Sequence, residues 1–245
     1  MFIAERGDSL CFSLLKVGSM NKFVCFFLFA AFNQAVYASV VITGTRVIYP
    51  ADAREVSVKL NNKGKRPVLI QSWIDDGDVK AKPETIHVPF VLTPPINRVE
   101  PGKGQTLRIS YTRQTLPEDR ESIYWLNVLE IPAKDPALKQ ENYLQMAFRS
   151  RIKLFFRPTK LEGNANDTAK KIIWKKKGAG ITGKNPTPYY ASLISITING
   201  KKIDADMIAP FAENAFNISG ATGEKISGIY VNDFGAIVEF ESQIN

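Results

Sequence analysis

The run Tyr143–Phe156 reads YLQMAFRSRIKLFF, and it is the longest strand-like segment of the chain. Its even positions are almost all apolar, and its odd positions are basic and polar through the middle. A repeat of two residues is typical of a β-strand, because successive side chains point to opposite faces. The segment therefore predicts a strand with one apolar face, and this pattern indicates a fold built from β-sheets.

Two interpretations of the apolar face stay open. The strand can cover the core of its own sandwich, or it can be an edge strand that offers this face to another chain by β-addition. The pattern of alternation does not separate the two.

Shorter β-rich runs precede this segment, and turn residues separate them. Seven strands in about 120 residues predict an immunoglobulin-like sandwich. The six earlier runs are Val40–Ile48, Glu55–Leu60, Val68–Ile74, His87–Leu92, Thr106–Tyr111 and Ser122–Ile131.

A second β-domain is predicted after the long strand. Pro158 ends that strand, and Leu161–Thr168 (LEGNANDT) has the polar composition of a linker. Further strand-like runs follow, with the hairpin signal Asn199-Gly200 between two of them. The prediction is an all-β chain of two immunoglobulin-like β-sandwich domains, an N-terminal one over residues 39–160 and a smaller one over residues 161–245.

The N-terminus predicts export. Residues 23–32 read FVCFFLFAAF, an apolar run that is too short for a membrane span but fits a secretory signal, and Lys22 precedes it. Val36-Tyr37-Ala38 has suitable residues for cleavage after Ala38, so residues 1–38 are interpreted as a signal peptide that leads to the periplasm. Met20 alone would begin a complete signal, so it is a candidate for the true start. A buried N-terminal strand or helix is the alternative.

The composition argues against several kinds of enzyme. The 245 residues include one histidine, His87, and two cysteines, Cys11 and Cys25, both in the predicted signal. A zinc site needs three or four Cys or His ligands, and a nucleophile–His–acid triad would have to use His87. No phosphate-binding or hydrolase motif is found. We expect a binding protein with no metal and no cofactor, rather than an enzyme.

The net charge of +8 does not indicate nucleic acid as the partner. Lys170-Lys171 and Lys175–Lys177 flank Trp174 and form a basic patch with an aromatic residue. The export signal argues against nucleic acid, so the patch is interpreted as the solvated face of a hairpin.

Several motifs together resemble the periplasmic chaperones of the chaperone–usher pilus pathway. Each is short, but they follow one another in the family's order along the predicted mature chain. They are TRVIYP at 45–50, TPP at 93–95 with Arg98, LPEDRESIYWLNVLEIP at 116–132, RIKLFFRP at 151–158, NPTPYY at 185–190 and NDFG at 232–235.

The resemblance implies two immunoglobulin-like domains set at an angle, with a cleft between them. It also implies a function: such chaperones bind pilus subunits as these reach the periplasm and pass them to an outer-membrane usher. The subunit is a sandwich that lacks its last strand, and the chaperone lends its own. The resemblance therefore implies pilus subunits and the usher as partners, and no membrane span.

The same resemblance assigns roles to individual residues. Arg46 and Lys153 match the cleft pair that anchors the subunit's C-terminal carboxylate, as two cations can do by charge-assisted hydrogen bonding. Leu144, Met146 and Phe148 match the alternating residues that enter the subunit's groove. Such exposed apolar residues also predict self-association of the free chain.

Three further matches concern the junction between the domains, a peptide bond and a loop. Glu121, Arg157 and Asp233 match ion pairs that join the two domains. Pro94-Pro95 matches a position where a cis bond occurs in the family. The short connection Ala133–Tyr143 and the absence of cysteine after residue 38 place the chain in the short-loop branch.

One alternative comes from a different functional class. A two-domain β-sandwich could itself be a structural pilus subunit or a surface adhesin. A pilus subunit is usually smaller and carries a disulfide and an exchangeable N-terminal strand, which this chain does not clearly show. A hydrolase is a third interpretation, weakened by the single histidine.

Overall fold

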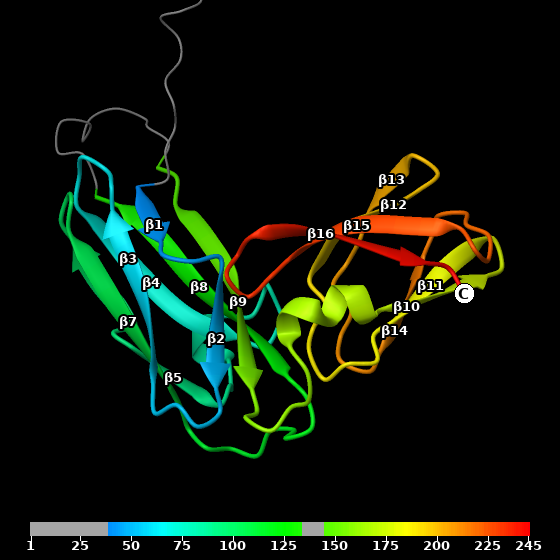
Figure 1. The fold of residues 1–245 in the computed structure, drawn as a ribbon. Coiled ribbons are helices and arrows are strands. Elements are labelled where there is room, and N and C mark those ends of the chain that lie inside the picture. Colours follow the sequence, from blue (N-terminus) through cyan, green and yellow to red (C-terminus); the bar gives the residue numbers. More distant parts are fainter. Residues whose placement is uncertain (1–38, 134–144) are drawn as a thin grey trace, which may run out of the picture. The chain divides into compact units, whose positions relative to one another are not determined.

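The computed structural model describes residues 39–133 and 145–245, and these residues are mostly β-strands (Figure 1). The predicted signal peptide, and most of the connection Ala133–Tyr143 on which the assignment to the short-loop branch depends, lie outside the described residues. No helix in the described part of the chain is long and apolar enough to cross a membrane.

Two sheets form the first sandwich, drawn from blue to green in Figure 1. Their strand orders are β1-β3-β7-β5 and β2-β9-β8-β4-β6. The strands are β1 (Val40–Ile42), β2 (Arg46–Pro50), β3 (Val56–Asn62), β4 (Val68–Asp75), β5 (Phe90–Thr93), β6 (Ile96–Val99), β7 (Gly104–Tyr111), β8 (Ser122–Pro132) and β9 (Phe148–Arg157), with a 3-10 turn η1 (Pro83–Thr85).

The second sandwich also has two sheets, drawn from yellow to red, with strand orders β10-β11-β14 and β13-β12-β15-β16. Its elements are the 3-10 helix η3 (Ala165–Lys171), β10 (Ile173–Lys177), β11 (Gly180–Lys184), β12 (Leu193–Ile198), β13 (Lys201–Asp204), β14 (Glu213–Phe216), β15 (Lys225–Val231) and β16 (Ile237–Gln243). Each sandwich encloses its own hydrophobic core, one around Tyr49 and one around Trp174. The predicted all-β fold with two sandwiches is thus confirmed.

Successive side chains of the five-stranded sheet alternate between its inner face and its outer face. Val47, Tyr49, Leu154 and Phe156 point inward and are buried in the core. The intervening positions of β2, β9, β8 and β4 therefore share the outer face of the sheet.

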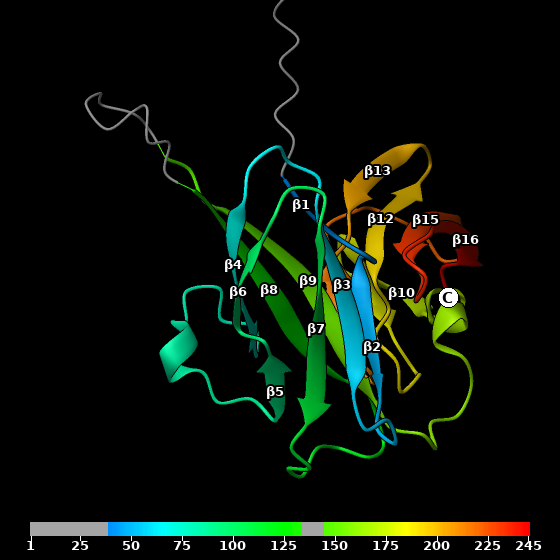
Figure 2. The ribbon, with the colours of Figure 1, turned by 90° about the vertical axis from the view of Figure 1, so that its left-hand side faces the viewer.

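The long strand β9 has two different halves. It pairs with antiparallel β8 from Phe148 to Phe156, beside which it runs in Figure 2. Parallel β2 pairs with β9 only from Lys153 to Arg157. Among the described residues, no second strand pairs with β9 from Phe148 to Ile152, so this half is a sheet edge.

The structure corrects the predicted start of this strand. Gln145–Ala147 lie before the β9 ladder rather than in it, and Tyr143 is outside the described residues. By the β8–β9 register Pro132 would lie opposite Met146, and proline has no N–H to donate to a ladder.

The cis bond near Pro94-Pro95 is Thr93–Pro94.

Candidate functional site

Arg46 and Lys153 lie side by side on neighbouring strands, although they are far apart in the sequence. The parallel register of β2 and β9 pairs them directly. Since Val47 and Leu154 point into the core, Arg46 and Lys153 share the outer face of the sheet. The fold thus places two cationic side chains next to each other, where the open half of β9 ends.

Arg46 is half-buried and only partly hydrogen-bonded. Its Nη1 donates to the Val231 carbonyl at 2.9 Å and to the Ser192 hydroxyl at 3.3 Å. Its Nε is buried and has no hydrogen-bond partner among the described residues. Burial lowers the pKa of Arg46, and the charges of Asp233 and Glu121 oppose this shift.

Lys153 forms no ion pair with an acid in the part of the chain that the structure describes. Among residues 39–133 and 145–245 it makes no hydrogen bond and no ion pair. Burial lowers the pKa of Lys153, and repulsion from Arg46 lowers it further, although Asp206 acts in the opposite direction. A carboxylate placed between Arg46 and Lys153 would relieve this repulsion and accept charge-assisted hydrogen bonds from both.

Arg157 joins the first sandwich to the second. Its Nε donates to Glu121 Oε1 at 2.7 Å, and its Nη1 and Nη2 donate to the two Asp233 oxygens at 2.7 and 3.0 Å. The other Glu121 oxygen accepts from the Tyr190 backbone N–H at 2.8 Å. Burial opposes the charge of Arg157, but the hydrogen bonds to Asp233 and the charges of both acids outweigh it and raise the pKa of Arg157. The structure therefore brings Glu121, Arg157 and Asp233 together.

Arg157→Ala is expected to destabilise the protein by about 3–5 kcal/mol, because it leaves the buried Glu121 carboxylate without its cation. Urea unfolding measures the loss. Lys225→Ala is the control, since Lys225 and Glu241 form an exposed pair whose removal should leave stability unchanged. An Arg157→Ala protein that unfolds at the wild-type urea concentration would contradict a structural role for these ion pairs.

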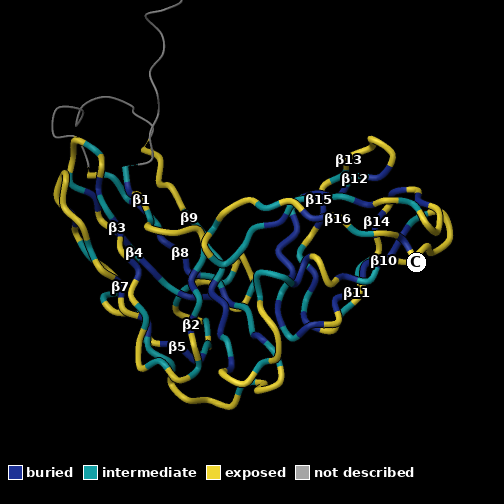
Figure 3. Tube along the Cα trace, in the orientation of Figure 1, coloured by how far each residue is buried: buried dark blue, intermediate teal, exposed yellow. Residues whose placement is uncertain are grey.

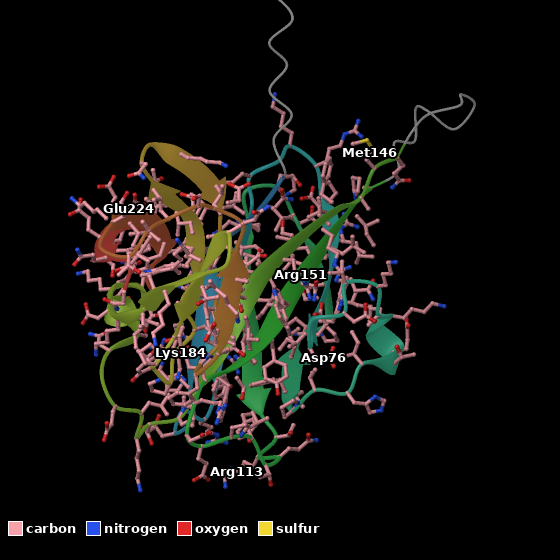
Figure 4. All side chains as sticks on the ribbon, turned by 90° about the vertical axis from the view of Figure 1, so that its right-hand side faces the viewer. Asp76, Arg113, Met146, Arg151, Lys184 and Glu224 are labelled. Atoms are coloured by element: carbon pink, nitrogen blue, oxygen red, sulfur yellow. The ribbon has the colours of Figure 1, made fainter. Side chains whose placement is uncertain are left out.

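Of the residues proposed for strand donation, Phe148 lies in the open half of β9 and Met146 lies just before it. The side chains of Met146 and Phe148 are 50% and 38% exposed. Figure 3 colours the tube before β9 as exposed, and Figure 4 shows Met146 at one end of the strand and Arg151 over the middle of the sheet. Leu144 lies outside the described residues.

The sequence analysis missed the partners of the two arginines on β9. Asp75 ends β4 on the outer face and is fully buried. It accepts two hydrogen bonds from Arg151, one of them at 3.2 Å, one from Asn127 at 2.7 Å and one from the Gly77 N–H at 2.8 Å. Burial would raise the pKa of Asp75, but these hydrogen bonds outweigh it and lower the pKa. Two arginines at alternating positions were a signal that an acid lies across the sheet, but the sequence could not say which acid.

These contacts distinguish Lys153 from its cationic neighbours. Arg149 and Arg151 on the same face pair with Asp75, and Arg157 pairs with Glu121 and Asp233. The described residues hold no group of three or more His, Cys, Asp or Glu side chains that could bind a metal ion. The chemistry that this face supports is therefore the binding of an anion beside an open strand edge.

Comparison with known proteins agrees with this arrangement. Residues 39–162 match the family model described as "Pili and flagellar-assembly chaperone, PapD N-terminal domain", and residues 167–242 match "Pili assembly chaperone PapD, C-terminal domain". The probable fimbrial chaperone YadV of Escherichia coli K12 is 44% identical over 236 residues, which cover 90% of this chain and 96% of the relative. The chaperone protein FimB/FhaD of Bordetella pertussis is 43% identical over 227 residues, which cover 89% of this chain and 93% of that relative.

A solved structure also matches most of the chain. It is the Salmonella enterica SafA pilin in complex with the SafB chaperone, with a TM-score of 0.74, 30% identity, and coverage of 85% of this chain and 97% of the matched chain. The family models together span both sandwiches. The chain therefore belongs to the family of PapD-like pili assembly chaperones.

Proposed function

We propose that the protein captures pilus subunits in the periplasm by lending them β9, and that it delivers them to an outer-membrane usher. One observation carries this proposal. Exposed Met146 lies just before β9, and exposed Phe148 lies in the half of β9 with a free edge. This half leads directly to Arg46 and Lys153, neither of which forms an ion pair among the described residues.

The two parts of this surface would recognise two features of one partner. A subunit that lacks its last strand exposes an apolar groove and unpaired backbone groups, and an added strand satisfies both. Its C-terminal carboxylate would bind between Arg46 and Lys153, which sets the register of the added strand. The structural relative SafB is found in complex with a pilin. The proposed function is binding and needs no catalysis and no cofactor.

Co-purification tests this function. The protein is produced with the pilus subunits of its own operon, and the periplasmic extract is passed over the tagged protein. We expect a partner of pilus-subunit size with wild-type protein and none with the double variant Arg46→Ala, Lys153→Ala. A chain found instead in the fibres sheared from the cell surface, without such a periplasmic partner, would favour a structural pilus subunit or adhesin.

We also propose that the mature protein begins at Ser39 and has an N-terminal domain over residues 39–160 and a smaller one over residues 161–245. The Glu130 carboxylate supports the proposed start. It is buried, one oxygen accepts from the Val40 N–H at 2.9 Å, and the other accepts from the Ser39 hydroxyl. Cleavage after Ala38 would place a new ammonium group on Ser39, beside this carboxylate.

N-terminal sequencing of the protein purified from periplasm is expected to begin at Ser39, because the residues before it have the pattern of a signal-peptide cleavage site. Substitution of Ala38 by a bulky residue should delay or shift cleavage. A mature chain that begins upstream of Lys22 would contradict the proposal.

A further inference from the structure

The half of β9 with a free edge is held from its outer face. Arg149 and Arg151 both lie in the part of β9 that β2 does not cover, since β2 pairing begins at Lys153. Their side chains point away from the core, on the face opposite Phe148. The support that β2 gives to the second half of the strand is thus replaced, in the first half, by side-chain contacts.

Asp75 is the centre of these contacts. It is fully buried, and both arginines reach it: Arg151 Nε lies 3.2 Å and Arg149 Nη2 lies 3.4 Å from Asp75 Oδ2. Arg149 also donates to the Asn127 side-chain oxygen at 2.9 and 2.7 Å and to the Val79 carbonyl at 2.8 Å. The contacts connect β9 to β8, to the end of β4 and to the segment that follows β4.

Two tryptophan rings complete this cluster. The guanidinium carbon of Arg149 lies 4.9 Å from the centre of the Trp73 ring, and that of Arg151 lies 4.6 Å from the Trp125 ring. A guanidinium held by both a ring and a carboxylate has few alternative rotamers. These contacts restrain the backbone of β9 at Arg149 and Arg151 and leave the opposite face free.

We propose that Asp75 is a positioning residue: through Arg149 and Arg151 it keeps the first half of β9 extended before a subunit arrives, and so raises the affinity of capture. This inference rests on the proposed function. A segment that is already extended loses less conformational entropy when it is added to another sheet. The apparent affinity falls in proportion to the fraction of time for which the strand is not in its binding-competent form.

Asp75→Asn in the full mature chain tests this proposal. Hydrogen exchange is expected to accelerate at the β9 amides that donate to β8 between Phe148 and Ile152, but not in β3 or β7. Affinity for a purified pilus subunit is expected to fall about tenfold, which corresponds to a strand that is ordered about a tenth of the time. Arg149→Gln is the second variant, should Asp75→Asn fail to fold, because it removes the guanidinium contacts of Arg149 and leaves Asp75 paired with Arg151.

A matched control separates positioning from stability. Ile70→Val removes a methylene from the buried core on β4, a strand that pairs with β6 and β8 and not with β9. It should therefore lower the free energy of unfolding without changing exchange in the first half of β9. Equal losses of affinity in Ile70→Val and Asp75→Asn at matched stability would overturn the proposal. Wild-type affinity and exchange in Asp75→Asn and Arg149→Gln would also overturn it. Either of these outcomes would contradict only the role of Asp75. The proposed function would still hold if wild-type protein binds the subunit and Lys153→Ala does not.

Discussion

Phe148→Ser is expected to weaken capture of a pilus subunit by about tenfold to a hundredfold, because burial of one phenylalanine in the subunit's groove contributes about 1.5–3 kcal/mol. The same change should leave the thermal midpoint close to that of wild type. Phe148 is 38% exposed, stands outside the hydrophobic core and belongs to the half of β9 with a free edge. Thermal unfolding and the subunit's dissociation constant, measured on the same preparation, check the two parts of this expectation.

Two control variants define what each outcome means. One control is Phe156→Ser. Phe156 lies on the same strand as Phe148, at another even-numbered position, but it is buried in the core. It should lower stability by about 3–5 kcal/mol, as large-to-small core substitutions do. Val91→Ser removes an exposed apolar side chain from β5 in the other sheet and should change neither property. A collapsed midpoint in Phe148→Ser would assign the residue to the protein's own core and remove the support for strand donation.

The same residue should control self-association of the free protein. Exposed Met146 and Phe148 beside an open edge offer a second chain both an apolar surface and backbone partners. We expect the sedimentation coefficient of wild-type protein to rise with concentration and that of Phe148→Ser to rise less. Equal concentration dependence in both proteins would show that another surface is responsible.

Lys153→Ala is expected to reduce subunit affinity by about tenfold to a hundredfold, since a hydrogen bond to a charged group contributes about 1.5–3 kcal/mol. Stability should change little, because Lys153 has no hydrogen bond or ion pair among the described residues to lose. Arg46→Ala should also weaken capture. Since Arg46 donates to Val231 and Ser192 in the second sandwich, Lys153 is the cleaner test of the anchor.

The pH dependence of capture follows from the position of Lys153. Its pKa is lowered from 10.5 by burial and by Arg46, so the ammonium loses its proton at a lower pH than an ordinary lysine. Capture by wild-type protein should weaken as the pH rises towards 10.5. Lys153→Arg should remain charged and lose this dependence.

A subunit with an amidated C-terminus gives the sharpest control. The amide keeps the strand and its apolar side chains but carries no charge, so it should bind wild-type protein at least as weakly as the natural acid binds Lys153→Ala. Lys153→Ala should bind the amide only a little more weakly than wild-type protein does, because amidation has already removed the charge that Lys153 would recognise. If the amide binds as tightly as the acid, the carboxylate is not the group that Arg46 and Lys153 recognise.

Strand content and the presence of two β-sandwiches could be predicted from the sequence because their causes are local. The alternation in Tyr143–Phe156, the linker-like Leu161–Thr168 and the turn at Asn199-Gly200 each depend on neighbouring residues. The resemblance to a family then assigned roles to Arg46, Lys153, Glu121, Arg157 and Asp233, residues that no pattern of spacing connects.

The residues that cover each face of β9 could not be predicted. An alternating sequence pattern indicates that successive side chains point to opposite faces, but it does not indicate which residues cover either face. The structure divides one apolar face in two: Leu154 and Phe156 are in the core, whereas Met146 and Phe148 are exposed. The division follows from where β2 begins and where the core ends. Both depend on segments far away in the chain.

The charged residues show the same limit. The sequence by itself determined that Arg149, Arg151 and Lys153 share a face of one strand, since a period of two is enough for that. Only the tertiary structure decided that Asp75 neutralises the first two and that Arg46 lies beside the third. The physical reason is that a charge acts through space over a few ångströms, and the order of strands in the sheet, rather than their order in the chain, sets which charges come that close.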